Sequence, residues 1–261
     1  MTKLTFLRRV DSTNLEWKRR LNDGEKLQGA GILIAYEQTG GRGRQGRKWH
    51  SPPGNLYISL AEPLTDLRAV NHQALLKGIV VYEAVETYLR ARRVKTANLT
   101  LKWPNDLLWA EKKLAGILLE TVAHPNGEQY LISGMGLNVA HAPDNSDHKT
   151  AAINAIISDQ ADAMQSNSLK PEKAIKDLAH QIRDQNKKWS AILVQENGEQ
   201  QIRDAWQQRA HPVGSKVKTT LKSAGEKQRG TFKGLSESGA AIIEFDGVEK
   251  SILAGDLFLE S

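Results

Sequence analysis

The stretch from Thr39 to Trp49 constrains this chain most, because it interleaves four glycines with four cations and ends in a tryptophan. Glycine lets the backbone take positive φ and approach a ligand without obstruction by a Cβ atom. Arginine supplies a rigid fork of donors that suits carboxylate and phosphate oxygens. The main-chain N–H groups of such a loop can form a concave nest for a small anion. The stretch therefore favours an anion-binding loop, although a solvated basic loop or an RNA-binding tract has the same composition.

The segments on either side of this loop indicate where it lies in the fold. Residues 30–35 form a nearly continuous apolar run, which is typical of a strand that is buried on both faces. Ser51-Pro52-Pro53-Gly54 forms a sharp turn and leads into a second apolar run at 56–60. We therefore expect the basic loop to connect two buried strands and not to lie in a tail.

The composition limits the classes of function. With 261 residues, the chain can form one large domain, or one domain plus a small one. The net charge of +6 favours an anionic partner such as phosphate, nucleic acid or an acidic protein. The absence of cysteine excludes disulfides, thiolate zinc sites and thioester chemistry, and it fits a reducing cytoplasm. The seven histidines lack ligand spacing, so we expect no metal cluster. No apolar run has the length of a signal peptide or a membrane helix, so we expect no membrane association.

Hydrophobic periodicity predicts many strands and few helices in the first 140 residues. The expected strands cover 4–10, 30–35, 56–60, 99–103, 107–109, 114–122 and 130–139. Helical spacing predicts a short helix over 15–21 and a longer one over 67–93. Hairpin turns at 112–113 and 125–127 join consecutive strands. This pattern indicates an α+β fold with a mixed, mostly antiparallel sheet flanked by helices.

The second half of the chain changes character near residue 210. Residues 141–168 are polar around a short helix near 153–157, and helices are expected from Pro171 and over 199–209. Short β-type runs punctuated by glycine follow, and together they predict a small barrel. These runs cover 216–221, 229–235, 240–245, 248–253 and 257–259. We therefore expect a domain over 1–210 and a second, small domain over 211–261.

Several ordered motifs resemble those of the biotin protein ligases, also called biotin–[acetyl-CoA-carboxylase] ligases. The signature loop GRGRQGRKW is followed by SPPGNLYISL, and the other motifs agree in order along the chain. These are Asp11-Ser12-Thr13-Asn14, Gln38, Lys102-Trp103-Pro104-Asn105-Asp106, Lys113-Leu114-Ala115-Gly116-Ile117-Leu118-Leu119-Glu120 and Gly134-Met135-Gly136-Leu137-Asn138-Val139. The match is dense in the first half of the chain and loose in the rest.

The resemblance implies a fold, an activity and a set of partners. The fold would be a class II aminoacyl-tRNA synthetase-like catalytic domain followed by an SH3-like β-barrel. The reaction would convert biotin and ATP, with Mg²⁺, to biotinyl-5′-AMP, and then transfer biotin to a lysine of the biotin carboxyl carrier domain of acetyl-CoA carboxylase or a related carboxylase. The resemblance also implies a cytoplasmic enzyme and leaves a homodimer open.

The same resemblance assigns residues to roles. Lys113 and Arg44 would be the catalytic residues, at the junction where carboxylate and phosphate react. The residues implied in biotin binding are Ser12, Thr13, Asn14, Gln38, Gly41, Arg42, Gly43, Arg44, Lys113 and Gly116. The residues implied in binding ATP or the adenylate are Arg42, Arg44, Trp49, Lys102, Asn105, Asp106 and Asn138.

Other interpretations remain for some of these residues. Ser12 and Thr13 can simply cap a helix, and Trp49 and Trp103 can pack and anchor the loop instead of stacking on a ligand. Some members of the family carry an N-terminal helix-turn-helix. Here the first strand is expected from residue 4, so we expect no specific DNA binding.

Two other functions compete with biotin ligation. A lipoate-protein ligase or an octanoyltransferase has the same fold, but its usual Arg-Arg-x-x-Gly-Gly-Gly loop followed by His-Asp is absent here. A nucleic-acid-binding protein would be basic along a whole face, whereas acidic residues are interspersed almost throughout this chain.

Overall fold

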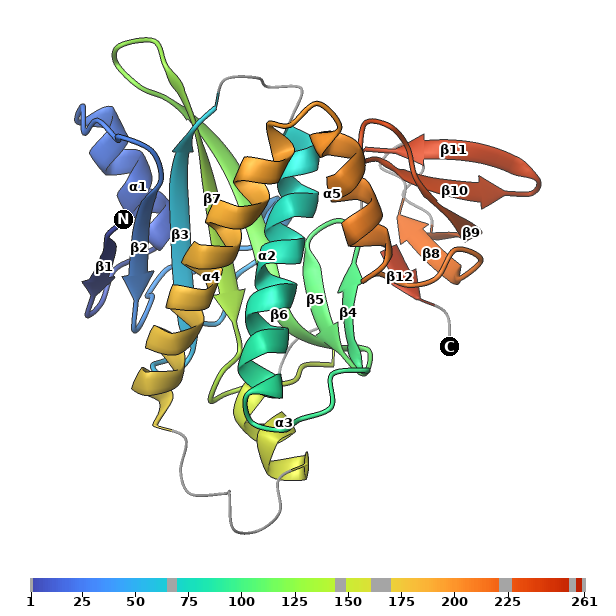
Figure 1. The fold of residues 1–261 in the computed structure, drawn as a ribbon, viewed down its shortest axis with the longest axis horizontal. Helices are drawn as coiled ribbons and strands as arrows, with labels where there is room; N and C mark the ends of the chain where they lie inside the picture. The colour runs from blue at the N-terminus through green and yellow to red at the C-terminus, as the bar shows by residue number, and fades with distance from the viewer. Residues whose placement is uncertain are drawn as a thin grey trace.

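The computed structural model describes residues 2–64, 70–143, 149–160, 170–220, 227–253 and 257–259. Its centre is a seven-stranded sheet with the strand order β1-β2-β3-β7-β6-β5-β4 (Figure 1). The strands are β1 (Leu4–Leu7), β2 (Gly31–Ala35), β3 (Leu56–Pro63), β4 (Leu99–Lys102), β5 (Asp106–Trp109), β6 (Lys112–Ala123) and β7 (Gln129–Leu137). The β1–β2 pair is parallel and the other five neighbouring pairs are antiparallel, which confirms the predicted mixed, mostly antiparallel sheet.

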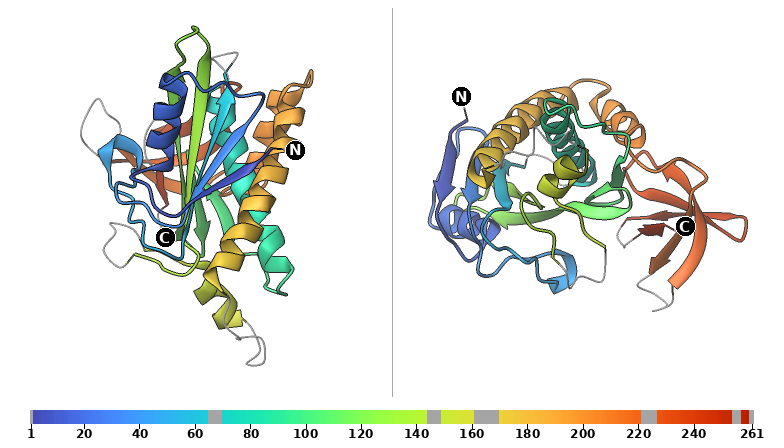
Figure 2. Two further views of the ribbon diagram at one scale, coloured as in Figure 1. Left: turned by 90° about the vertical axis from the view of Figure 1, so that its left-hand side faces the viewer. Right: turned by 90° about the horizontal axis from the view of Figure 1, so that it is seen from below.

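Helices cover both faces of the sheet (Figure 2). Helices α2 (Val70–Arg90) and α4 (Pro171–Leu193) cover one face, and α1 (Thr13–Asn22) packs on the other. Successive side chains of a strand point to opposite faces. Ile32 and Ile34 accordingly join the core under α2 and α4, while Leu33 joins Trp17 of α1. The run at 30–35 is therefore buried from both sides, as its continuous apolar sequence predicts.

Several boundaries differ from the sequence-based expectation. Strand β1 ends at Leu7, and Val10 makes only an isolated bridge to Gln38 where the chain turns toward α1. Helix α1 begins at Thr13, two residues earlier than expected. The remaining helices are α3 (Ile153–Gln160), α5 (Gly198–Gln207) and a short 3₁₀ turn, η1 (Arg44–Gly46). Parts of the expected helix over 67–93, the polar segment over 141–168 and the strand over 216–221 lie outside the described residues. No helix in the described part of the chain has the length and apolar character needed to cross a lipid bilayer.

The C-terminal strands form a second antiparallel sheet with the order β11-β10-β9-β8-β12. The strands are β8 (Lys216–Thr220), β9 (Lys227–Leu235), β10 (Ala241–Phe245), β11 (Val248–Ile252) and β12 (Leu257–Leu259). All five lie where the sequence predicts strands. Among the described residues, however, the order is open, with β11 and β12 at its edges, where the sequence led us to expect a barrel.

The second sheet docks closely against the first unit (Figure 1). Val217, Phe232 and Ile243 belong to the same continuous apolar cluster as the residues under α2. The turn between β9 and β10 reaches the end of β4, where the indole Nε1 of Trp103 donates a hydrogen bond of 3.3 Å to the carbonyl of Gly239. Trp103 is thus a packing residue at the junction of the two sheets.

Candidate active site

A cavity of about 340 Å³ opens on the face of the sheet that carries α1. Its walls come from the start of α1, the glycine-rich loop between β2 and β3, the β4–β5 turn, and strands β6 and β7. Every residue that the sequence analysis assigned to a site lines this cavity, except Gly41. Segments separated by more than 100 residues in the sequence therefore meet at one place.

Gly41 is buried beneath the loop and serves its packing. A Cβ atom at this position would lie 2.3 Å from Ser51 Oγ and 2.5 Å from the carbonyl oxygen of Trp49. The amide of Trp49 donates a 3.0 Å hydrogen bond to the carbonyl of Gly41. Only glycine lets the two ends of the loop approach so closely.

The start of α1 presents short polar groups to the cavity. Ser12 is the N-cap residue in an extended conformation, but its side chain makes no capping hydrogen bond, so side-chain capping by Ser12 was a wrong interpretation. Thr13 instead donates from its amide (2.8 Å) and its hydroxyl (3.1 Å) to Gln38 Oε1. Gln38 Nε2 in turn donates to Ser51 Oγ at 3.2 Å. These bonds fix Thr13 and Gln38 relative to each other across the end of β2.

Asn14 is held on both sides of its amide group. Its Oδ1 accepts a 2.6 Å hydrogen bond from the buried Ser59 hydroxyl, and its Nδ2 donates to Glu120 Oε2 at 2.8 Å. A Cβ atom on Gly134 would lie 2.3 Å from Asn14 Oδ1, so the absence of a side chain at Gly134 makes room for this amide.

A buried carboxylate collects two lysines on the opposite side of the cavity. Asp106 Oδ1 lies 2.7 Å from Lys113 Nζ, and Asp106 Oδ2 lies 3.4 Å from Lys102 Nζ. Burial alone raises the pKa of Asp106, but the positive charges of Lys113 and Lys102 outweigh it and hold that pKa below its ordinary value. Asp106 is therefore ionised at neutral pH, and this side of the cavity keeps a net positive charge.

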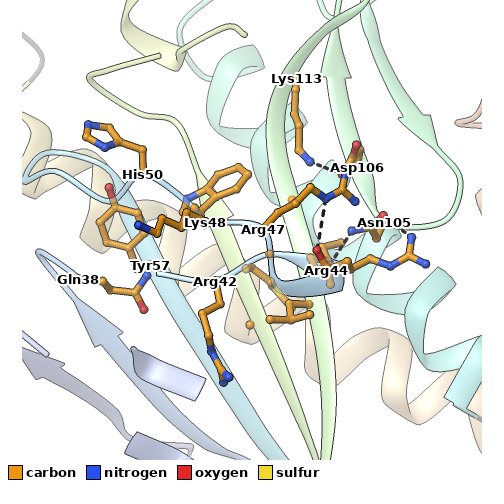
Figure 3. A pocket seen from close by; sticks show the side chains of 18 of the residues that line it. Gln38, Arg42, Arg44, Arg47, Lys48, His50, Tyr57, Asn105, Asp106 and Lys113 are labelled. Carbon is orange, nitrogen blue, oxygen red and sulfur yellow. Dashed lines mark hydrogen bonds and ion pairs between the residues drawn. The ribbon is translucent and has the colours of Figure 1, made fainter. Parts of the chain in front are cut away.

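The glycine-rich loop brings Arg44 to the same side (Figure 3). Arg44 Nη1 donates to Asn105 Oδ1 at 3.2 Å, and Asn105 Nδ2 donates to the carbonyl of Ile117 at 2.8 Å. Arg47 Nε bonds the Arg44 carbonyl at 3.3 Å and stabilises the η1 turn. The guanidinium group of Arg42 points away from this group of residues and pairs with Glu120, at 3.1 Å.

Glycines on β6 and β7 form a flat floor beneath Trp49. Gly116 and Gly136 are cross-strand partners, and Cβ atoms there would lie 3.1 Å and 2.5 Å from the Trp49 ring. Lys113 Nζ lies 5.4 Å from the centroid of the same ring. Trp49 is thus packed against β6 and β7 in this structure. Its buried indole Nε1 has no hydrogen-bond partner among the described residues.

Asn138 is almost fully buried and supports the backbone of the site. Its Nδ2 donates to the carbonyl of Ala151 at 3.1 Å, and its amide donates to the carbonyl of Leu114 at 3.0 Å. Both donors are thus used to join β6, β7 and the segment that leads into α3.

The sequence analysis missed several residues that line the cavity. These are Arg47, Lys48, His50, Tyr57, Ile117, Leu118, Gly134, Met135, Gly136, Pro143 and Thr150. Gly134 and Gly136 were quoted in a motif without a role, and their spacing could have placed both on the cavity face, because alternate residues of a strand share one face. Tyr57 and Thr150 carry no comparable signal.

The charge of the cavity suits anionic ligands. Asp106 is the only carboxylate among the described residues that line it, against Arg42, Arg44, Arg47, Lys48, Lys102 and Lys113. Within the described part of the chain, no group of three or more His, Cys, Asp or Glu side chains is placed to hold a metal ion. Neutral polar groups lie at the α1 end, where Arg42 is paired with Glu120, and Arg44, Lys102 and Lys113 gather at the β5 end. The cavity therefore suits a ligand with a neutral polar head and an anionic tail.

Comparisons with known proteins agree with this arrangement. Residues 6–138 match the sequence model of the biotin/lipoate A/B protein ligase family. The chain is 32% identical over 254 residues to the biotin–[acetyl-CoA-carboxylase] ligase of Paracoccus denitrificans, covering 97% of this chain and 99% of that protein. It resembles the Aquifex aeolicus biotin protein ligase in complex with biotin and ATP, with 27% identity, a TM-score of 0.72 and coverage of 100% and 99%. It also resembles the Leishmania major biotin protein ligase in complex with biotinyl-5-AMP, with 26% identity, a TM-score of 0.62 and coverage of 97% and 99%.

Proposed function

Because the chain belongs to the biotin/lipoate A/B protein ligase family and is an enzyme of the biotin protein ligase type, we propose that it activates biotin with ATP and transfers it to a lysine of a biotin carboxyl carrier domain. The observation that carries the proposal is the polarity of the cavity, with neutral amide and hydroxyl groups at one end and Arg44, Lys102 and Lys113 at the other. Biotin has the matching polarity, with a neutral ureido ring and a carboxylate tail.

The α1 end is assigned to the ureido ring. A buried ring with two N–H donors and a carbonyl needs hydrogen-bond partners, because desolvation otherwise opposes binding. Ser12, Thr13, Asn14 and Gln38 supply such groups on fixed backbone. The absence of side chains at Gly116 and Gly136 makes room for the Trp49 ring on the floor of the cavity.

The cationic end is assigned to the reacting groups. In the first step a carboxylate oxygen of biotin attacks the α-phosphorus of ATP, a C–O–P bond forms, and the bond to the β-phosphate breaks to release pyrophosphate. The substrate is the nucleophile, so the enzyme acts by holding two anions together and stabilising the charge that develops on phosphorus. Arg44 and Lys113 are proposed to do this, with Arg42, Gly43 and the loop amides beside them.

The nucleotide side is proposed to consist of Lys102, Asn105, Asp106, Asn138 and Trp49. Mg²⁺ usually takes one or two carboxylates together with substrate phosphates. Asp106 is the carboxylate on this side that would hold it, in competition with Lys102 and Lys113, which face its two oxygens. When bound, Mg²⁺ would neutralise phosphate charge. The protein's own part is to keep Asp106 ionised through Lys102 and Lys113.

In the second step the uncharged amine of the acceptor lysine attacks the carbonyl of biotinyl-5′-AMP, an amide bond forms, and AMP leaves with the electron pair. The acceptor is proposed to be the carrier domain of acetyl-CoA carboxylase or a related carboxylase. The catalytic domain is proposed to span 1–210 on a class II synthetase-like sheet. Residues 211–261 are proposed as an SH3-like domain, on the basis of the five antiparallel strands found there. No specific DNA binding is part of this proposal, and a homodimer is compatible with it.

The test is to incubate the protein with ATP and either biotin or lipoate and to detect the adenylate by mass. The expected result is biotinyl-5′-AMP with release of pyrophosphate, followed by a mass increase of a carrier domain upon its addition. Formation of lipoyl-AMP in preference to biotinyl-5′-AMP would assign the chain to the lipoate branch. Formation of neither adenylate would reject the proposal.

A further inference from the structure

Glu120 lies outside every role assigned so far, yet it connects three parts of the cavity wall. It is on β6, seven residues after Lys113, and its side chain is 17% exposed. Its carboxylate accepts hydrogen bonds from Lys18 Nζ at 2.6 Å, Asn14 Nδ2 at 2.8 Å and Arg42 Nη2 at 3.1 Å. Lys18 and Asn14 belong to α1, whereas Arg42 belongs to the glycine-rich loop.

The charge at this point is well defined. Burial alone raises the pKa of Glu120, but the hydrogen bonds from Lys18 and Asn14, together with the charges of Lys18 and Arg42, hold that pKa below its ordinary value. Glu120 is thus an anion at neutral pH, and it is the acidic group between two cations that would otherwise repel each other.

An ionised carboxylate accepts hydrogen bonds and cannot donate them. Glu120 therefore fixes which way the amide of Asn14 faces, since only the NH₂ group of Asn14 can point toward it. The carbonyl Oδ1 of Asn14 is then directed to Ser59 and to the space above Gly134, where it lines the cavity as an acceptor. A neutral amide at position 120 would remove this requirement and leave the 3.4 Å hydrogen bond from Asn14 Nδ2 to the Leu118 carbonyl to set the orientation.

The pair with Arg42 restrains the loop. Glycines at 40, 41, 43 and 46 make the open loop costly to order, and the cations within it repel one another. A charge-assisted hydrogen bond from Arg42 to β6 opposes both effects. A guanidinium group has five N–H donors, so pairing through Nη2 leaves other donors of Arg42 for an anionic ligand.

We propose that Glu120 is a positioning residue for biotin binding, which ties the glycine-rich loop, through Arg42, to the start of α1, through Lys18 and Asn14. It touches neither substrate. It fixes the position of the Asn14 carbonyl oxygen relative to the glycine-rich loop. The statement about biotin rests on the proposed function, whereas the tie between loop and helix does not.

The experiment compares Glu120→Gln with a matched control, Glu16→Gln. Glu16 is also a carboxylate that pairs with two cations, Arg19 and Arg20, but neither it nor these partners line the cavity. Two quantities are measured: hydrogen exchange of the amides of residues 40–49 in the protein without ligand, and KM for biotin and kcat in adenylate formation. Glu120→Gln loses a charge-assisted hydrogen bond, so the amides of the loop are expected to exchange faster. KM for biotin is expected to rise by about tenfold, whereas kcat at saturating biotin is expected to stay within about twofold of the wild-type value. Glu16→Gln is expected to change neither.

Two further variants separate positioning from a general loss of structure. Glu120→Asp keeps the charge and is expected to restore part of the loop protection. In an Arg42→Met background, Glu120→Gln is expected to add little to the rate of loop exchange, because the partner of the tie is already absent. Additive effects on exchange would overturn the tie.

Unchanged loop exchange in Glu120→Gln would also overturn the tie, and faster exchange with an unchanged KM would overturn its link to biotin. If the wild-type protein forms no biotinyl-5′-AMP, the proposed function fails, while the exchange measurement still decides whether Glu120 holds the loop.

Discussion

Asp106 Oδ1 lies 2.7 Å from Lys113 Nζ, and this ion pair joins the motif of the β4–β5 turn to the motif that contains the proposed catalytic lysine. The two residues belong to paired strands, β5 and β6. Asp106 also holds Lys102, so one carboxylate sets the position of two ammonium groups at the cationic end of the cavity.

Removing a cation from this end is expected to impair the first reaction step. Arg44→Ala and Lys113→Ala should each lower the rate of adenylate formation by roughly 10²–10³, because each removes a preorganised donor to the developing charge. The neighbouring, exposed Lys112 provides the control, and Lys112→Ala should retain the rate. Single-turnover formation of the adenylate is the measurement. A drop of less than about threefold in both active-site variants would refute their assignment.

A methyl group on the floor of the cavity is expected to disturb biotin binding. In Gly134→Ala the new Cβ atom would fall 2.3 Å from Asn14 Oδ1, so the Asn14 amide must move. KM for biotin should rise by about tenfold or more, because buried polar groups of the ligand would lose partners. Ser133→Ala, next to it on β7, removes a buried hydroxyl that has no partner among the described residues, and it should leave KM unchanged.

The stability of the junction between the sheets should depend on pH through His211. Its side chain lines a small apolar cavity with Trp206 and Phe232, and burial together with the charge of Lys102 lowers its pKa to about 4. Between that value and the unfolded pKa of about 6.5, the unfolded chain binds more protons than the folded one, so the free energy of unfolding falls as the pH is lowered through this window. In denaturant titrations from pH 7 to pH 4, the free energy of unfolding should decline less for His211→Gln than for the wild type. His180→Gln, at an exposed position on α4, controls for the loss of a histidine as such.

The acceptor reaction tests the role of net charge. A chain with a net charge of +6 should capture an acidic carrier domain faster at low ionic strength. The kcat/KM for the carrier domain should fall as the Debye length shrinks from about 30 Å at 0.01 M to about 8 Å at 0.15 M. Adenylate formation in the same buffers is the control for a general effect of salt. If kcat/KM for the carrier domain does not change with ionic strength, docking by backbone pairing at a sheet edge would be favoured instead.

Local patterns predicted much of the fold, because strand alternation, helix spacing and turn residues act over a few positions. The buried run at 30–35 and the turn before 56 correctly placed the basic loop between two strands. The five C-terminal strands were also predicted, but not the order in which they pair, because pairing depends on contacts across the whole unit.

The lining of the cavity was predicted in part, whereas its internal contacts were not. Motif residues as far apart as Thr13 and Asn138 line one cavity. The pairing of Arg42 with Glu120 joins positions 78 residues apart, and no local pattern indicates which carboxylate an arginine will select. For the same reason, the side chain of Ser12 looked like a cap when the helix was considered alone, yet the start of α1 is secured by Gln38 through Thr13.

The hydrogen bond from Trp103 to Gly239 joins the C-terminal sheet to the side of the cavity proposed for the nucleotide, because Trp103 directly follows Lys102 and lies three residues before Asp106. Linkage between the two is reciprocal. A change that loosens the β9–β10 turn is then expected to lower the affinity for any ligand that is bound by Lys102 and Asp106. Such a ligand, once bound, raises the cost of detaching the turn by the same free energy. Ligand binding in the cavity is therefore expected to stabilise the C-terminal strands against unfolding.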